Sequence, residues 1–255
     1  MKKQTIAKGQ IKLSKIPTTA PKGLDKKTIE KKTRKMAKRI GELQEMLQAN
    51  RKQNLLIVFQ GMDSSGKDGS TRAAFGDCSP SGVKAVGFKK PTDEELAHDL
   101  LWRIHKHAPA KGEITIFIRS HYEDVLVQRV HKWIDKKRVD ARIDAINAFE
   151  TLLEVDNNTT VLKFYLHLSK ARQLEKLTER KEEEDKFYKH NPGDWDERKL
   201  WNQYRRCYED AINRAAIPWY IVPVDDRWYR NYVITSIVLE TLEGFKLKWP
   251  ALKEE

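Results

Sequence analysis

Short apolar runs alternate along the chain with longer segments of helical periodicity. The apolar runs cover residues 55–59, 83–88, 114–118, 160–166 and 219–224, and their length and composition predict buried strands. The predicted helices cover residues 25–50, 70–75, 92–104, 125–153, 194–215 and 226–242. Strands that alternate with helices predict an α/β fold, in which helices sandwich a five-stranded parallel sheet.

The same pattern predicts the domain organisation. Residues 1–24 are basic and are interrupted by Pro17, Pro21 and Gly23, which predicts an N-terminal tail or arm with solubility as its simplest role. We expect residues 25–255 to form a single domain. One α/β domain accommodates this length, and 39% hydrophobic residues suffice for a core.

Two capping-box patterns predict where helices begin. Thr92 is followed three residues later by Glu95, and Asp194 is followed by Glu197 at the same spacing. In a capping box the side chain of the first residue accepts a hydrogen bond from the backbone N–H of the third helical residue. The side chain of that third residue in turn accepts a hydrogen bond from the backbone N–H of the first. We therefore expect helices to start next to Thr92 and Asp194.

Charge and cysteine content narrow the class of protein. Lys and Arg total 49 against 37 Asp and Glu, and the resulting net charge of +12 favours polyanionic partners. Cys78 and Cys207 are far apart and lack metal-ligand spacing, which fits a reducing cytoplasm. No apolar run is long enough for a membrane span, and no signal peptide is evident, so we expect a cytoplasmic protein.

The clearest chemical motif follows the first predicted strand. Gly61, four intervening residues and Gly66-Lys67 have the spacing of a phosphate-binding P-loop. Glycines allow backbone N–H groups to close around phosphate oxygens, and the lysine adds a positive charge. Asp68 replaces the Ser or Thr that usually binds magnesium, so Asp63 is the natural metal ligand in this loop.

Further charged residues follow the third predicted strand, at the edge where ligands bind in doubly wound sheets. Arg119 is placed to contact phosphate, although a surface arginine that pairs with Glu123 or Asp124 is the alternative. Glu123 and Asp124 are either metal ligands or acids that favour a helix start. Because the strand ends at Ile118 rather than at an acid, metal binding falls to Asp63, Glu123 and Asp124.

Residues 169–206 are rich in charges of both signs, and Arg180 and Lys186 are among the cations. Such a segment is typical of a mobile cover over a phosphate site, with the lid spanning approximately residues 169–198. An ordinary solvated helix pair is the alternative. For the region as a whole, aromatic side chains next to the cations favour the mobile cover over the solvated helix pair. They are Phe187, Tyr188 and Trp195.

Four separated stretches resemble the polyphosphate kinase 2 family. They are GMDSSGKDG at 61–69, FKKP leading to ELAHDLLWR at 88–103, RSHYEDVL at 119–126 and KHNPGD at 189–194. The likeness covers nearly all of residues 25–247. Family members have Asp or Asn where this chain has Ile118.

The resemblance implies a P-loop kinase fold like that of thymidylate kinase, with a helical lid. It implies reversible transfer of the terminal phosphate of inorganic polyphosphate to nucleoside mono- or diphosphates, with Mg²⁺ or alternatively Mn²⁺ as cofactor. AMP and ADP are the expected acceptors, with GMP and GDP as further ones. The last two of the four stretches resemble the branch that accepts both AMP and ADP.

The motifs and the resemblance together predict roles for individual residues. The catalytic residues would be Asp63, Lys67 and Arg119. Polyphosphate would contact Gly66, Lys67, Asp68, Gly69, Ser70, Arg72 and Arg180. The nucleotide would contact Lys89, Arg103, Arg119, Tyr122, Glu123 and Lys186, and the metal would be held by Asp63, Glu123 and Asp124.

Two other functions fit a basic P-loop protein. An ATP-dependent nucleoside or nucleotide kinase would share the loop and the lid. A non-catalytic module that binds nucleotides or nucleic acid would use the basic surface, but the chain has neither a guanine-reading Asn-Lys-x-Asp motif nor an aromatic-and-glycine RNA motif. We expect no nucleic-acid or membrane partner, and we expect a homo-oligomer, either a dimer or a tetramer.

Overall fold

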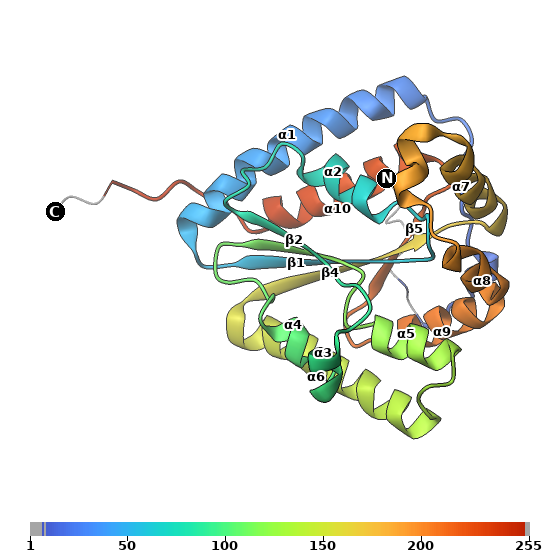
Figure 1. Ribbon diagram of the computed structural model, residues 1–255. Coiled ribbons are helices and arrows are strands. Elements are labelled where there is room, and N and C mark those ends of the chain that lie inside the picture. Colours follow the sequence, from blue (N-terminus) through green and yellow to red (C-terminus); the bar gives the residue numbers. More distant parts are fainter. Residues whose placement is uncertain (1–6, 8, 253–255) are drawn as a thin grey trace.

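The computed structural model describes residues 7 and 9–252, and its centre is a parallel sheet (Figure 1). Within these residues the sheet has five strands in the order β2-β3-β1-β4-β5. The strands are β1 (Asn54–Gln60), β2 (Val83–Gly87), β3 (Ile114–Ile118), β4 (Thr159–His167) and β5 (Trp219–Pro223). The predicted α/β class and the five predicted strands are therefore confirmed.

Helices cover both faces of the sheet (Figure 1). One face packs against α1 (Lys26–Asn50), α2 (Lys67–Phe75) and α10 (Arg227–Gly244). The other packs against α4 (Trp102–His105), α5 (Glu123–Val130), α6 (Lys136–Asn157) and α9 (Trp201–Asn213). The remaining helical elements are η1 (Leu13–Lys15), α3 (Asp93–Ala97), α7 (Lys170–Glu182), η2 (Glu184–Lys189) and α8 (Gly193–Lys199). Across the described residues, no helix combines the length and apolar character that crossing a bilayer requires.

Neighbouring residues of the central strand β1 point to opposite faces of the sheet. Leu56 and Val58 belong to the core under α5, α6 and α9, whereas Leu55, Ile57 and Phe59 belong to the core under α1 and α10. All of these side chains are fully buried. A strand covered on both faces needs an uninterrupted apolar run, which is the pattern seen in the sequence.

The predicted helix that Thr92 opens is in fact two short helices. Its capping box is confirmed, because Thr92 and Glu95 exchange backbone and side-chain hydrogen bonds. The helix then ends at Ala97 because His98 has an extended backbone. The Asp99 carboxylate accepts a hydrogen bond from the N–H of Leu101, just before α4 begins.

The predicted helix over residues 125–153 is also broken, into α5 and α6. Lys132 has a φ of 59°, a left-handed conformation that an α-helix does not accommodate. Asp135 then caps α6 by accepting a hydrogen bond from the N–H of Arg138 at 2.8 Å. The apolar periodicity continues through this break, which is why the sequence indicated one helix.

The segment before α1 is packed against the domain, which corrects the prediction of a tail for its described part. Leu13 is fully buried in the core. The N–H of Ala7 donates to the carbonyl oxygen of Trp219 on the edge strand β5, and the N–H of Leu13 donates to Glu209 at 2.8 Å. Contacts of this kind cover a strand edge that would otherwise be open to solvent.

Leu13→Ala is expected to lower the free energy of unfolding by about 2–5 kcal/mol, because it leaves a cavity in the core. Urea unfolding followed by circular dichroism would measure this change. Leu252→Ala is the matched control, since Leu252 is 90% exposed, and it should change stability by less than about 0.5 kcal/mol. Equal stability of both variants would contradict a packed N-terminal segment.

Candidate active site

The loop between β1 and α2 has the backbone conformation that a phosphate-binding loop needs. Gly61 has a φ of 155° and Gly66 a φ of 90°, values that favour glycine. A Cβ atom on Gly66 would lie 1.9 Å from a guanidinium nitrogen of Arg230, and one on Gly61 would lie 2.8 Å from the carbonyl oxygen of Leu166. Both positions therefore require glycine for conformation and for packing.

Lys67, the first residue of α2, turns back into this loop. Its ammonium group donates to the carbonyl oxygens of Gly61 at 2.8 Å and Met62 at 3.2 Å. Burial, followed by the nearby Arg119 charge, lowers the pKa of Lys67 to about 8, although Asp63 opposes the shift. The lysine and the N-terminus of α2 direct positive charge to the same place, which suits a phosphate group.

The other P-loop residues expected to contact polyphosphate lie on the first turn of α2. Ser70 is buried, and its hydroxyl donates to the carbonyl oxygen of Gly66 at 3.0 Å. Asp68 is exposed, and Gly69 lies beside a buried guanidinium group. Polyphosphate contacts for these residues stay a prediction.

Asp63 and Arg119 form an ion pair across the loops that follow β1 and β3. Arg119 Nη2 lies 2.8 Å from Asp63 Oδ1, and the backbone N–H of Arg119 donates to the carbonyl oxygen of Phe59. Burial alone would raise the pKa of Asp63, but Lys67 and Arg119 outweigh it and hold the pKa below its usual value. The predicted arginine at the strand end is thus brought to the P-loop.

Glu123, on the first turn of α5, reaches the same group of charges. Burial raises the pKa of its carboxyl, although the cations Arg119 and Lys67 oppose the shift and Asp63 adds to it. Mg²⁺ is commonly held by one or two carboxylates together with substrate phosphates, so Asp63 and Glu123 fit such an ion. Within the part of the chain that the structure describes, no group of three or more His, Cys, Asp or Glu residues forms a metal site.

Asp124 lies away from this group, which corrects its predicted place in the metal site. Its carboxylate accepts hydrogen bonds from Arg103 at 3.4 Å and Gln128 at 2.6 Å. Arg103 is itself buried and also donates to the carbonyl oxygen of Lys89 at 3.1 Å. Arg103 thus fixes the loop after β2, whereas the side chain of Lys89 is exposed and free to meet a ligand.

Tyr122 is a core residue, which corrects its predicted contact with the nucleotide. Its side chain is only 1% exposed, and its hydroxyl accepts a hydrogen bond from Lys163 at 2.7 Å. Its ring packs edge-on against Trp219, with ring centroids 4.8 Å apart. A ligand at the P-loop cannot reach a side chain in this position.

The helices α7, η2 and α8 form a cap that contacts the P-loop. Gln173 of α7 donates to the carbonyl oxygen of Asp63 at 3.2 Å and accepts a hydrogen bond from Arg198 of α8 at 2.9 Å. Arg180 pairs with Asp194 at 2.6 Å, and its charge also helps to lower the pKa of Asp63. The predicted lid region therefore lies over the loop, and its movement stays a prediction.

The capping box predicted for Asp194 and Glu197 is wrong. α8 begins at Gly193, so Asp194 lies inside the first turn, where its carboxylate pairs with Arg180. Glu197 accepts hydrogen bonds from His131 at 2.9 Å and from the hydroxyl of Tyr204 on α9 at 2.5 Å. Both acids thus bind side chains from other elements instead of their own backbone.

Lys186, expected to contact the nucleotide, is engaged within the cap. It pairs with Glu179 at 2.9 Å and with Glu183. Burial opposes a low pKa at Glu179, but the hydrogen bonds from Lys176 and Lys186 lower it to about 2. A role for Lys186 in nucleotide binding stays a prediction that would require these pairs to open.

A groove with a volume of about 950 Å³ runs beside α2, next to α1 and the start of α10. Its basic lining residues are Lys26, Arg34, Arg72, Arg172 and Arg227. Its acidic lining residues are Glu30, Asp77, Asp225 and Asp226, and the carboxylates of the last two accept hydrogen bonds from the N-terminal segment. We call this cavity the basic groove.

Arg230 is a buried cation behind the P-loop. Its guanidinium group lies against Gly66 and Gly69 and donates to Asn231, which lines the groove, at 2.7 and 3.0 Å. Burial, with a smaller contribution from Arg227, lowers the pKa of Arg230 to about 10. Sequence reasoning missed Arg230, Gln173 and the role of Asp194, because no local motif marks them.

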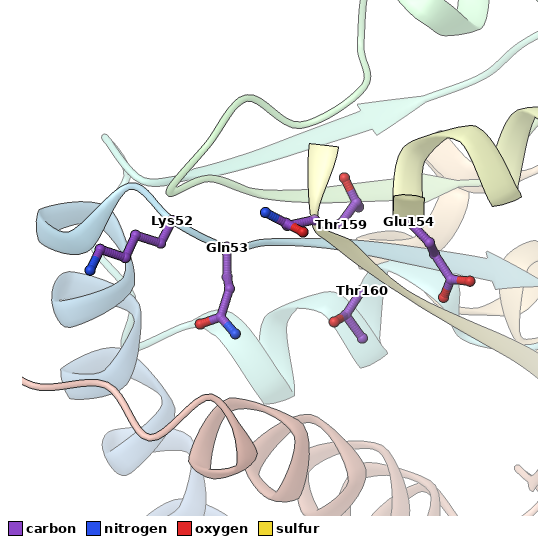
Figure 2. A pocket seen from close by; sticks show the side chains of 6 residues that line it. Lys52, Gln53, Glu154, Thr159 and Thr160 are labelled. Atoms are coloured by element: carbon purple, nitrogen blue, oxygen red, sulfur yellow. The ribbon is translucent and has the colours of Figure 1, made fainter. Parts of the chain in front are cut away.

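A second cavity, of about 570 Å³, lies at the opposite edge of the sheet (Figure 2). Its lining residues are Lys52, Gln53, Glu154, Asn158, Thr159 and Thr160. They lie where β1 and β4 begin, so the length of the strands separates this cavity from the P-loop. In doubly wound sheets, ligands bind at the carboxyl ends of the strands, which favours the P-loop edge as the active site.

Comparisons with known proteins agree with this geometry. The family model described as polyphosphate kinase 2 matches residues 23–249. An AMP/ADP-polyphosphate phosphotransferase of Meiothermus ruber is 44% identical over 216 residues, which span 84% of this chain and 80% of that protein. An ADP-polyphosphate phosphotransferase of Rhodopseudomonas palustris is 34% identical over 85% of this chain and 80% of its own. The crystal structure of polyphosphate kinase 2 from Arthrobacter aurescens superimposes with a TM-score of 0.93 at 36% identity, covering 98% of this chain and 91% of that one.

The depressed pKa of Lys67 predicts a pH-dependent cost to stability. Because the native pKa of about 8 lies below the value in the unfolded chain, the unfolded state binds more protons between the two values. The cost is therefore full below about pH 8 and disappears as the pH rises toward about 10.5. Lys67→Met should be about 1–3 kcal/mol more stable than the natural protein near pH 7, and this difference should shrink near about pH 10.

Urea unfolding at both pH values would measure this difference. Lys52→Met is the control, because Lys52 is exposed at the opposite edge of the sheet and should show no such pH-dependent difference. A constant difference between Lys67→Met and the natural protein at all pH values would contradict the depressed pKa.

Proposed function

The chain belongs to the polyphosphate kinase 2 family, and we propose that it transfers the terminal phosphoryl group of inorganic polyphosphate to AMP and ADP. The observation that carries this proposal is the charged group at the P-loop, Lys67 with Asp63 and Arg119, together with a cation-lined groove beside the same helix α2. A nucleoside triphosphate needs a site for three phosphates, whereas a phosphate polymer needs a site that continues. The Meiothermus ruber relative, whose name includes both AMP and ADP, supports the choice of acceptors.

The donor chain would lie along the basic groove and end at the P-loop. Polyphosphate carries about one negative charge per phosphate, so the +12 protein attracts it and the groove cations hold it. The N-terminus of α2 and Lys67 would then bind the terminal phosphates. Phosphate oxygens would replace the loop carbonyl oxygens as hydrogen-bond acceptors for Lys67.

An oxygen of the acceptor phosphate would attack the terminal phosphorus in line, which breaks the bond to the bridging oxygen and releases polyphosphate shorter by one phosphate. Phosphoryl transfer depends mainly on positioning and on charge stabilisation, and a nucleotide phosphate is already anionic, so no general base is needed. Arg119 would stabilise charge on the transferred group, and Arg180 would contribute from the cap. The same contacts serve the reverse reaction.

Asp63 and Glu123 would hold the Mg²⁺ ion, with Mn²⁺ as the alternative. The ion would neutralise part of the charge on the phosphates. Without it, Asp63 fixes Arg119 directly through their ion pair.

Assembly into a dimer or tetramer stays a prediction, for which the exposed Leu152 and Val155 on α6 supply apolar surface.

Lys67→Met and Asp63→Asn are each expected to lower nucleotide phosphorylation by about 10²–10³-fold, because each removes a charge at the site of transfer. Chromatography would follow AMP and ADP after mixing with Mg²⁺ and long-chain polyphosphate. Lys52→Met, at the far edge of the sheet, should keep full activity. If the natural protein left both nucleotides unchanged but transferred phosphate from ATP to a nucleoside, it would be an ATP-dependent kinase.

Reversing one charge in the basic groove should weaken donor binding specifically. Arg34→Glu is expected to raise the KM for polyphosphate by about 10-fold and to leave kcat nearly unchanged, because Arg34 lines the groove away from the reacting atoms. Its KM should also depend less on salt. Arg39→Glu changes the same kind of residue on the same helix outside the groove and should behave like the natural protein. Equal effects of both variants would exclude the groove as the donor site.

A further inference from the structure

A fully buried network of charged groups lies beneath the loop that carries Arg119. The side chains of Lys163 on β4, Glu150 on α6 and His121 each have 0% of their surface exposed. Lys163 Nζ lies 2.5 Å from one carboxylate oxygen of Glu150, and His121 Nε2 lies 3.2 Å from the other. We call these three residues the buried network.

A buried ion pair of this kind is weak evidence of a contribution to stability. Lys163 lies inside the sheet on β4, where it is in register with Val58 on one neighbouring strand and Trp219 on the other. Taking two charged groups out of water is costly, and apolar residues of similar volume in place of a buried ion pair are often neutral or stabilising. The reason for the network must therefore be sought in the groups it contacts.

Glu150 and Lys163 bind the last two residues of the loop between β3 and α5, at positions 121 and 122. His121 binds Glu150, and the hydroxyl of Tyr122 accepts a hydrogen bond from Lys163 at 2.7 Å. The residue that starts the loop, Arg119, is directed instead to the active site. Arg119 has a φ of 62°, a conformation that persists only where the surrounding structure holds it.

We propose that Glu150 and Lys163 are positioning residues, which hold the loop from below so that Arg119 meets Asp63. Both side chains are fully buried, so neither is accessible to a substrate. The inference rests on the proposed function, because the position of Arg119 affects turnover only if Arg119 contacts the transferred phosphate. A misplacement of about 1 Å costs about 10²-fold in rate, so a loop that is free to shift would lose most activity.

The first test needs no turnover. In the double variant Glu150→Leu/Lys163→Met, which removes both charges together, the guanidinium NMR signals of Arg119 should move toward those of a solvent-exposed arginine. Arg119→Lys assigns these signals by their disappearance. Unchanged Arg119 signals in the folded double variant would overturn the proposal, whether or not the natural protein uses polyphosphate.

The second test is a double-mutant cycle on kcat. The double variant should lower kcat by about 10²-fold with the KM for polyphosphate little changed. In an Arg119→Ala background the same change should cost less than about 3-fold, because the network acts through Arg119. An equal loss in both backgrounds would overturn the proposal. Absence of polyphosphate-dependent activity in the natural protein would instead refute the proposed function.

Two further variants keep the proposal testable if the double variant does not fold. His121→Leu breaks the contact with the loop and leaves the Lys163–Glu150 pair intact, so it should shift the Arg119 signals and lower kcat. His121→Gln, whose amide Nε2 takes the place of the imidazole Nε2 and can still donate to Glu150, should preserve both. Natural behaviour of His121→Leu would overturn the proposal.

The control is a buried polar residue far from the site. Asn54 is fully buried at the start of β1 and donates to the carbonyl oxygen of Pro109 at 3.1 Å. Asn54→Ala should lower the melting temperature without moving the Arg119 signals. If it moved them as much as the network variants do, the effect would be general destabilisation and the proposal would fall.

Discussion

The ion pair between Asp63 and Arg119 is the constraint on which the site depends. It joins the loops that follow two adjacent parallel strands, and it gathers Lys67 and Glu123 into one group of mutually compensating charges. Each of these groups has lost part of its hydration, so each depends on the others for charge compensation. Removing one partner changes the surroundings of all the rest. Such a group is preorganised to bind phosphate, because the cations that an incoming anion contacts have already lost part of their hydration.

The two halves of this pair are supported from opposite faces of the sheet. The P-loop is held from the α10 face, where Arg230 packs against Gly66 and Gly69. The Arg119 loop is held from the α6 face, where Glu150 binds His121 and Lys163 binds Tyr122. The cap closes the arrangement from a third direction, through the hydrogen bond from Gln173 to the P-loop. The sheet thus fixes the spacing of the two loops, and the layers on either side fix their orientation.

Stability and function are in tension at several of these positions. Burial depresses the pKa values of Lys67 and Arg230, which means that keeping both charged costs folding free energy. The extensive apolar cores on both faces of the sheet, together with the packed N-terminal segment, offset this cost. Proteins commonly tolerate buried charges that lower stability where activity requires them.

The sequence by itself determined the strands, the P-loop and the placement of Asp63, Lys67 and Arg119 at strand ends. These features are local, because an apolar run of strand length and a glycine spacing each depend on a few neighbouring residues. Only the tertiary structure decided that Asp124 faces Arg103, that Tyr122 is buried, that residues before α1 pack on the core, and that Arg230 reaches the P-loop. Each of these depends on the register and packing of elements far apart in the chain, which no local pattern encodes.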